Sequence, residues 1–113
     1  MRDLLCHRSG LSRGDLVWYG TDFSREEILH RVRHLEPTWS FRSTYGYQNI
    51  MFLAAGQVAA ALAGESWDDI IRNRFFKPLD MKRSVTSVKK LGRMRNVARP
   101  HGCLLYTSDA ADE

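Results

Sequence analysis

The feature that most constrains the fold of this chain is the apolar, alanine-rich run from Ile50 to Ala63. Alanine has the highest helix propensity of all residues, and its small side chain lets neighbouring elements pack closely. Asn49 precedes the run as an expected N-cap, and Gly64 follows it where a left-handed residue ends a helix. The run is shorter than the roughly 20 apolar residues that cross a bilayer. We therefore expect a buried core helix and no membrane span.

A helix upstream of this run is predicted from its start and stop signals. Ser24 can act as N-cap, and Glu27 completes a capping box. Glu36-Pro37 should end the helix, because the residue before a proline disfavours the α region. Between these signals the apolar residues recur at helical spacing, namely Ile28, Leu29, Val32 and Leu35.

A further helix is predicted downstream, and the rest of the chain is predicted to be mostly loop. Ser66 and Asp69 form a second capping pair, and Pro78 should stop the helix that follows. Met1 to Cys6 is expected to be the end of a helix, and Ser84 to Val88 one short strand. The predicted buried stripe of the downstream helix consists of Trp67, Ile70, Ile71 and Phe75.

The charge of the chain does not indicate a nucleic-acid partner. The 113 residues include 17 Lys and Arg against 13 Asp and Glu, a net charge of +4. The basic residues are scattered between apolar stripes, and no helix carries them on one continuous face. No DNA- or RNA-binding motif is present. We interpret the basic residues as solvated surface of a single small domain.

A Tyr-x-Asn step, Tyr47-Gln48-Asn49, stands directly before the apolar run. His7-Arg8-Ser9-Gly10-Leu11 lies upstream and Lys77-Pro78-Leu79-Asp80-Met81 downstream, while Gly56 and Gly64-Glu65-Ser66-Trp67 fall in register with them. Together these motifs resemble the beta-lactamase-related serine hydrolases, which include penicillin-recognising enzymes, class C beta-lactamases, D-amino peptidases and esterases. Asp80 departs from the family pattern, in which glycine is more usual, and this puts a turn in doubt.

The resemblance implies a fold. The complete family fold packs a helical lobe beside an antiparallel sheet, with the active site between them. This chain would supply mostly the helical lobe, a mostly α fragment of the α/β beta-lactamase/transpeptidase-like fold. Residues 1–102 would then be a partial beta-lactamase-related domain.

The resemblance also implies the chemistry. Tyr47 matches the family tyrosine, which acts as general base or proton relay for an attacking serine. Asn49 matches the asparagine that hydrogen-bonds the family's lysine and the substrate amide. Tyr45 competes with Tyr47 for its role, but spacing to Asn49 selects Tyr47. The implied reaction cleaves an ester, amide or β-lactam bond of a small molecule or peptide through an acyl-serine intermediate, with no metal and no organic cofactor.

The other two motifs of the family site are not found. The family has Ser-x-x-Lys before the Tyr-x-Asn step, and residues 1–46 contain none. Ser87 to Lys90 fits the spacing but lies downstream, and no Lys-Thr-Gly or His-x-Gly strand is visible. We expect the chain to be a piece of a longer enzyme, entered partway at Met1, and to be inactive by itself. The alternative is a non-catalytic binding or scaffolding member of the same fold.

The last eleven residues, Cys103 to Glu113, resemble the translation of a transposon-end adapter used to prepare DNA sequencing libraries. We expect residues 103–113 to be an unnatural tail that is not part of the natural domain. Without this tail Cys6 is the single cysteine, and a single cysteine forms no internal disulfide.

Two further arrangements suggest chemistry and have simpler interpretations. His7-Arg8-Ser9-Gly10 lacks the first glycine of a Gly-x-Ser-x-Gly nucleophile elbow, so we expect structural roles for His7 and Ser9. His30 and His34 have the spacing of two metal ligands on a helix, but no third ligand stands at a recognisable spacing. We expect surface histidines and no metal site.

Overall fold

The computed structural model describes residues 1–98, which fall into two compact units. The first unit runs from Met1 to Ile70, and the second begins at Ile71. The predicted tail at residues 103–113 lies outside the described residues. Between residues 1 and 98 there are helices, turns and loops but no β-strand, in agreement with a mostly helical chain.

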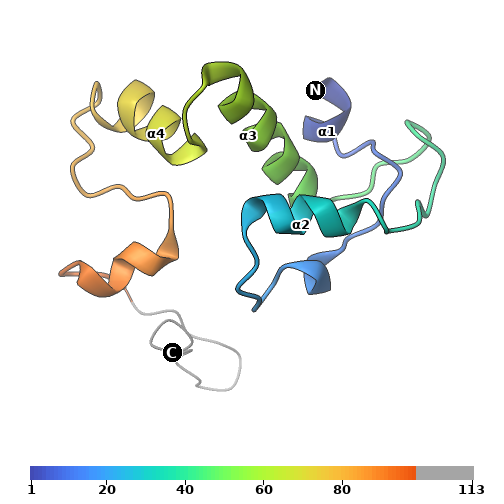
Figure 1. The fold of residues 1–113 in the computed structure, drawn as a ribbon, viewed down its shortest axis with the longest axis horizontal. Helices are drawn as coiled ribbons and strands as arrows, with labels where there is room; N and C mark the ends of the chain where they lie inside the picture. Colours follow the sequence, from blue (N-terminus) through green and yellow to red (C-terminus); the bar gives the residue numbers. More distant parts are fainter. Residues whose placement is uncertain (99–113) are drawn as a thin grey trace. The chain divides into compact units, whose positions relative to one another are not determined.

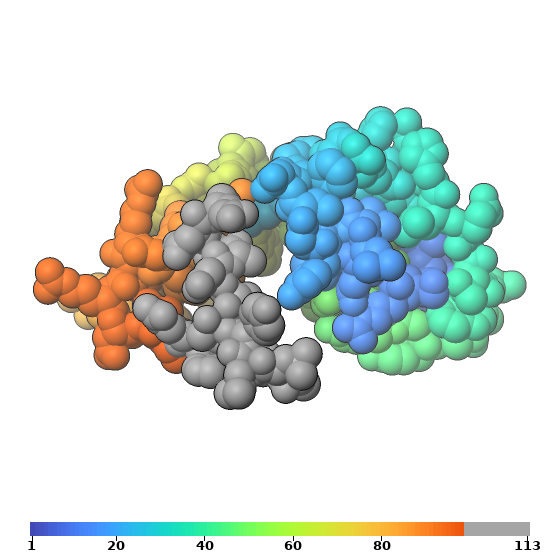
Figure 2. All heavy atoms as spheres, turned by 90° about the horizontal axis from the view of Figure 1, so that it is seen from below, coloured from blue at the N-terminus to red at the C-terminus, as the bar shows by residue number. Residues whose placement is uncertain are grey.

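The first unit is built around the predicted apolar helix, but the prediction that this helix is buried holds only for Ile50, Met51 and Ala55, and Leu62 near its end is 84% exposed. This helix, α3, spans Asn49–Ala63 and contacts both α1 (Arg2–Leu5) and α2 (Arg25–Val32) (Figure 1). A 3-10 turn, η1 (Asp15–Val17), also contacts α2, and α4 (Trp67–Ile71) follows α3 in the chain. In the space-filling view the blue residues before α2, α2 itself and the green start of α3 form one continuous body (Figure 2).

Burial is concentrated where α2 and α3 meet. Val32, Ile50 and Met51 form a buried cluster, in which Ile50 is only 1% exposed. The predicted apolar stripe of α2 is confirmed, although the helix ends at Val32 and Leu35 lies beyond it. The partly buried residues packed on this cluster are Leu4, Leu11, Val17, Trp18, Ile28, Leu29 and Leu35.

Most of the predicted helix caps are present. Ser24 Oγ accepts a hydrogen bond from the backbone N–H of Glu27 at 3.1 Å, and Ser66 Oγ accepts one from that of Asp69 at 3.1 Å. Gly64 ends α3 in the left-handed conformation, with φ of 67°. These bonds satisfy backbone groups at the helix ends that have no partner inside the helix.

The prediction that Asn49 caps α3 is wrong. The helix already includes Asn49, and the N-cap position is held by Gln48, whose side chain makes no capping bond. The Asn49 side chain instead accepts a hydrogen bond from Tyr47. The local rule fails here because another side chain competes for the asparagine oxygen.

The second unit begins with a π-helical segment, η2 (Arg72–Phe76), and contains a 3-10 helix, η3 (Val88–Arg93). The predicted strand at residues 84–88 is wrong. Ser87 Oγ accepts a hydrogen bond from the backbone N–H of Lys89 at 3.3 Å, and this local bond starts η3. A strand there would leave its backbone groups unpaired, since residues 1–98 contain no second strand.

Two further expectations for this region have clear outcomes. Asp80 forms the turn that was in doubt: its φ is 53°, a left-handed conformation that aspartate tolerates better than most residues. Ile70 is buried as predicted, but Phe75 is 50% exposed, contrary to the prediction. The α-helix ends at Ile71, and the wider π-helical turn moves the later side chains off the α-helical stripe.

No single helix in residues 1–98 has the length and hydropathy of a membrane span. The α3 helix satisfies that test only when it is joined across a bend with the helical residues 67–76.

Candidate active site

The backbone before α3 directs Tyr47 and Asn49 to one side. Gln48 is extended, with φ of −155° and ψ of 125°, and alternate side chains of an extended segment point to the same face. Tyr47 Oη donates a hydrogen bond of 2.9 Å to Asn49 Oδ1. Tyr47 is 47% exposed, so its side chain is not enclosed by this unit. The structure therefore brings together the two residues that were predicted as a catalytic pair.

Gln48 points to the opposite side and anchors the step in the interior. It is 0% exposed, and its Nε2 donates to the backbone oxygen of Ser12 at 2.8 Å. Its backbone N–H donates to Nδ1 of His7 at 3.2 Å. Gln48 Oε1 is buried without a hydrogen-bond partner in residues 1–98. The middle residue of the motif thus holds the two outer residues in place.

The imidazole of His7 lies against the aromatic residues of this step. His7 is 9% exposed, and its ring centroid is 4.7 Å from that of Tyr47. Phe52, on the first turn of α3, lies at 5.1 Å, and Tyr45 is edge-on at 5.5 Å. Tyr45 is 65% exposed, and the asparagine oxygen is bonded to Tyr47 and not to Tyr45. Tyr47, and not Tyr45, is therefore the tyrosine that contacts Asn49.

Close backbone contacts hold the loop that carries Tyr45 and Tyr47. The N–H of Gly46 donates to the backbone oxygen of His7 at 2.9 Å. A Cβ on Gly46 would lie 2.6 Å from the ring of Trp39 and 3.0 Å from the oxygen of Leu11. Only glycine fits between these groups without displacing one of them.

One positive charge lies near the phenol. The Arg13 guanidinium carbon is 5.9 Å from the centroid of the Tyr47 ring, and Arg13 is ion-paired with Asp15. The arginine therefore adds a screened positive potential beside the ring. Neither the place of Arg13 nor that of the His7 ring was predicted, because both reach the motif across more than 30 residues of chain.

A cavity of about 600 Å³ lies beside the pair within the first unit. Asn49 reaches its wall, and Arg25, which also lines it, is ion-paired with Asp68 at 2.7 Å. Gly56 lies below the indole of Trp67, at 3.6 Å from an added Cβ, which is ordinary contact. Apart from Gln57, the remaining lining residues are apolar: Met1, Leu5, Trp18, Ile28, Ile50, Phe52, Leu53, Ala55, Ala59 and Trp67.

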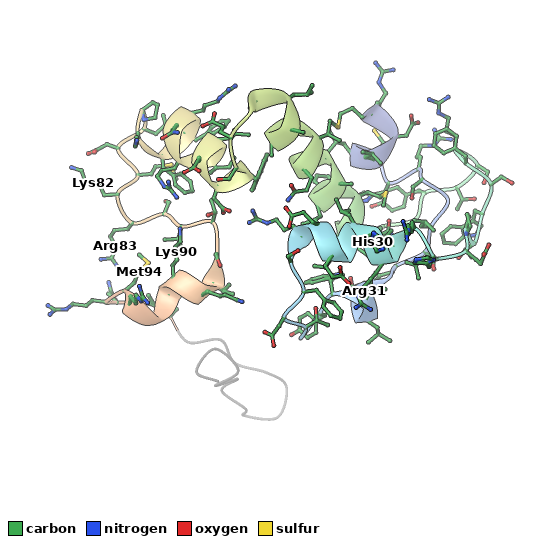
Figure 3. All side chains as sticks on the ribbon, viewed as in Figure 1. His30, Arg31, Lys82, Arg83, Lys90 and Met94 are labelled. Atoms are coloured by element: carbon green, nitrogen blue, oxygen red, sulfur yellow. The ribbon has the colours of Figure 1, made fainter. Side chains whose placement is uncertain are left out.

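The other candidate residues make local contacts away from the Tyr47–Asn49 pair. The rings of His30 and His34 are 6.3 Å apart on the α2 side of the unit, where His30 is labelled (Figure 3). No group of three possible metal ligands occurs in residues 1–98. Ser9 Oγ accepts from the backbone N–H of Leu11 at 3.3 Å, a local turn bond. Ser87 caps η3, which carries Lys90 (Figure 3), and both lie in the second unit.

Comparison with known proteins identifies the family. A family model described as beta-lactamase matches residues 1–106. The chain belongs to the beta-lactamase family. It is 30% identical over 94 residues to an unguisins hydrolase of Aspergillus campestris (strain IBT 28561), covering 79% of the chain and 17% of that protein. Gigasin-6 of Magallana gigas is 22% identical over 83 residues, covering 73% of the chain and 28% of that protein.

A solved structure gives the same result for the fold. The crystal structure of D-amino acid amidase from Ochrobactrum anthropi SV3, complexed with L-phenylalanine amide, matches with a TM-score of 0.57 and 31% identity. The match covers 72% of this chain and 24% of the amidase chain. The chain therefore has a beta-lactamase-like relative of known structure, and it spans less than a third of the length of each of these relatives.

Proposed function

We propose that this chain carries the Tyr-x-Asn part of an acyl-transfer site. The whole enzyme would cleave an amide, ester or β-lactam bond through an acyl-serine intermediate. The observation that carries the proposal is the 2.9 Å hydrogen bond from Tyr47 Oη to Asn49 Oδ1, at the start of α3. Membership of the beta-lactamase family supports it, and the names of the relatives, a hydrolase and an amidase, favour hydrolysis of an amide.

In this proposal Tyr47 is a proton relay: its oxygen accepts the proton of the attacking serine while its own hydroxyl proton leaves Asn49 Oδ1 and goes to the leaving group. Its own hydrogen is directed to Asn49, so its oxygen remains free to accept a hydrogen bond from a hydroxyl or an ammonium group. Asn49 Nδ2 has no hydrogen-bond partner in residues 1–98, so its two N–H groups are available for a substrate carbonyl or amide. Neither role requires a metal or an organic cofactor.

We further propose that residues 1–113 alone do not hydrolyse these substrates. Residues 1–46 contain no Ser-x-x-Lys, and the single such pair, Ser87 and Lys90, begins a 3-10 helix in the second unit. The test is incubation with nitrocefin, p-nitrophenyl esters and an amino-acid amide, with a Ser87→Ala variant as control. No turnover above buffer is expected for either protein. Turnover that a serine-reactive inhibitor blocks would contradict the proposal.

The role of Tyr47 is tested in a longer protein expressed from the surrounding coding DNA. If that frame encodes Ser-x-x-Lys ahead of these residues, Tyr47→Phe should lower kcat by about 10²- to 10⁴-fold, because proton transfer is lost. Tyr45→Phe is the matched control and should change kcat by only a few fold. Equal losses in the two variants would refute the assignment. A frame without a reactive serine would favour the non-catalytic binding or scaffolding protein.

The domain boundaries are part of the same proposal. We propose that residues 1–102 are a partial beta-lactamase-related domain and that residues 103–113 are derived from an adapter, although the family match extends to residue 106. The DNA around codon 103 tests this boundary. Adapter sequence starting there would support it, and continuous genomic sequence would contradict it.

A further inference from the structure

We propose that His7 is a positioning residue for the Tyr47–Asn49 pair. Its Nδ1 fixes the backbone between the two side chains, and its ring supports the phenol. This role goes beyond the proposed function. It rests on that function only in so far as Tyr47 and Asn49 take part in catalysis. A histidine that only fills space would need neither the hydrogen bond from the Gln48 N–H to its Nδ1 nor its left-handed backbone conformation.

The first part of the role is the hydrogen bond to the backbone. Nδ1 of His7 accepts from the N–H of Gln48 at 3.2 Å, and Gln48 is the residue whose extended backbone sends Tyr47 and Asn49 to one face. A nitrogen that accepts a hydrogen bond carries no proton, so this contact requires the ring N–H of His7 to be on Nε2. Gln48 is fully buried, and without this acceptor its N–H would have no partner. An apolar side chain at position 7 could fill the space but could not satisfy this donor.

The second part of the role is support of the phenol ring. The rings of His7 and Tyr47 are 4.7 Å apart and inclined by 44°, a tilted contact that limits where the phenol can lie. Tyr47 is 47% exposed, so few other groups restrain it. The imidazole also contacts Phe52 of α3, with the two ring centroids 5.1 Å apart. The imidazole thus links the phenol to the helix that carries Asn49.

The backbone of His7 is itself held in an uncommon conformation. Its φ is 55°, a left-handed value in which histidine is found more often than most residues with a side chain. Its backbone oxygen accepts from Gly46 at 2.9 Å, and its N–H donates to Leu4 at 3.3 Å. Such conformations persist only where the surrounding contacts impose them. These contacts aim the imidazole at the Tyr-x-Asn step.

Two substitutions separate the two parts of the role. His7→Phe keeps a flat ring and removes the acceptor, whereas His7→Asn keeps an acceptor, tolerates a positive φ and removes the ring. Both are studied in the 113-residue chain by NMR. In His7→Phe, hydrogen exchange at the Gln48 amide should become about tenfold faster while the Tyr47 ring signals keep their positions. In His7→Asn, the amide should stay protected and the Tyr47 signals should move toward those of free tyrosine.

Protection of amides in the middle of α3 shows whether a variant is folded. In a folded variant, unchanged Gln48 exchange and unchanged Tyr47 signals would overturn the proposal. If both variants lose the protection of α3, the imidazole nitrogen shifts of the unmodified protein decide it. An unprotonated Nδ1 supports the role, and a protonated Nδ1 overturns it. None of these readouts depends on turnover, so failure of the Tyr47→Phe test would refute the proposed function and leave this inference standing.

Discussion

Substitution of Gly10 by alanine tests whether the loop beside the candidate site is held by direct backbone contact. Gly10 has φ of 92°, and an added Cβ would lie 2.4 Å from the carbonyl oxygen of Trp39. That oxygen is part of the backbone and cannot rotate away as a side chain would. The oxygen of Gly10 also accepts from the N–H groups of Thr38 at 2.9 Å and Trp39 at 3.0 Å. Relief of the overlap therefore requires the two segments to separate and these bonds to break.

The expected loss has two parts. A left-handed conformation costs alanine about 1–2 kcal/mol, and forced overlap in a packed site costs about 1–3 kcal/mol. The free energy of unfolding should therefore fall by about 2–5 kcal/mol in Gly10→Ala. Gly20 is the matched control, because its φ is 71° and nothing lies within 4 Å of an added Cβ. Gly20→Ala should show only the first part, about 1–2 kcal/mol.

Urea unfolding followed by far-ultraviolet circular dichroism measures both variants. If the first unit is less stable than the expected loss, Gly10→Ala should show no cooperative transition where Gly20→Ala still shows one. Equal midpoints for the two variants would refute the reasoning, because backbone overlap is the feature that distinguishes Gly10 from Gly20.

Two further predictions concern stability. The hydrogen bonds from Arg42 lower the pKa of Asp3 below its usual 3.8, so the pair stabilises the fold above about pH 4 and this contribution is lost as the pH falls through the lowered pKa. Asp3→Asn should flatten that part of the acid unfolding curve, and an unchanged curve would contradict the pairing. Ile50→Ala should cost about 2–5 kcal/mol in urea unfolding, because Ile50 is 1% exposed. Leu62→Ala, at 84% exposure, should change stability by less than about 0.5 kcal/mol, and similar losses would refute the core assignment.

The helices could be predicted because their signals are local. The cap at Ser24 and the left-handed end at Gly64 each depend on a few neighbouring residues, and both form as predicted. The stripe of α2 packs on Ile50 because its period matches the helix. The Tyr47–Asn49 contact also follows from local spacing, since an extended residue lies between them.

The failures occur where distant or competing partners decide. The predicted strand at residues 84–88 does not form because a strand needs a neighbouring strand, and the bond from Lys89 to Ser87 favours a 3-10 turn. The support of the motif by His7 and the nearby charge of Arg13 involve contacts across more than 30 residues of chain. Single-sequence periodicity contains no information on such pairings.

The start of α3 shows why the wrong cap prediction is informative. An asparagine at the N-cap would direct its oxygen to the backbone of its own helix and stabilise it by about 1 kcal/mol. Here the helix begins one residue earlier, and the N-cap passes to Gln48, whose side chain is bonded to Ser12 and caps nothing. This leaves Asn49 Oδ1 for Tyr47 and its N–H groups free. Natural sequences depart from locally optimal choices mainly where function requires it. The uncapped helix start is therefore expected if Asn49 is placed to bind a substrate, because an Asn49 at the N-cap would direct its oxygen to the helix backbone instead.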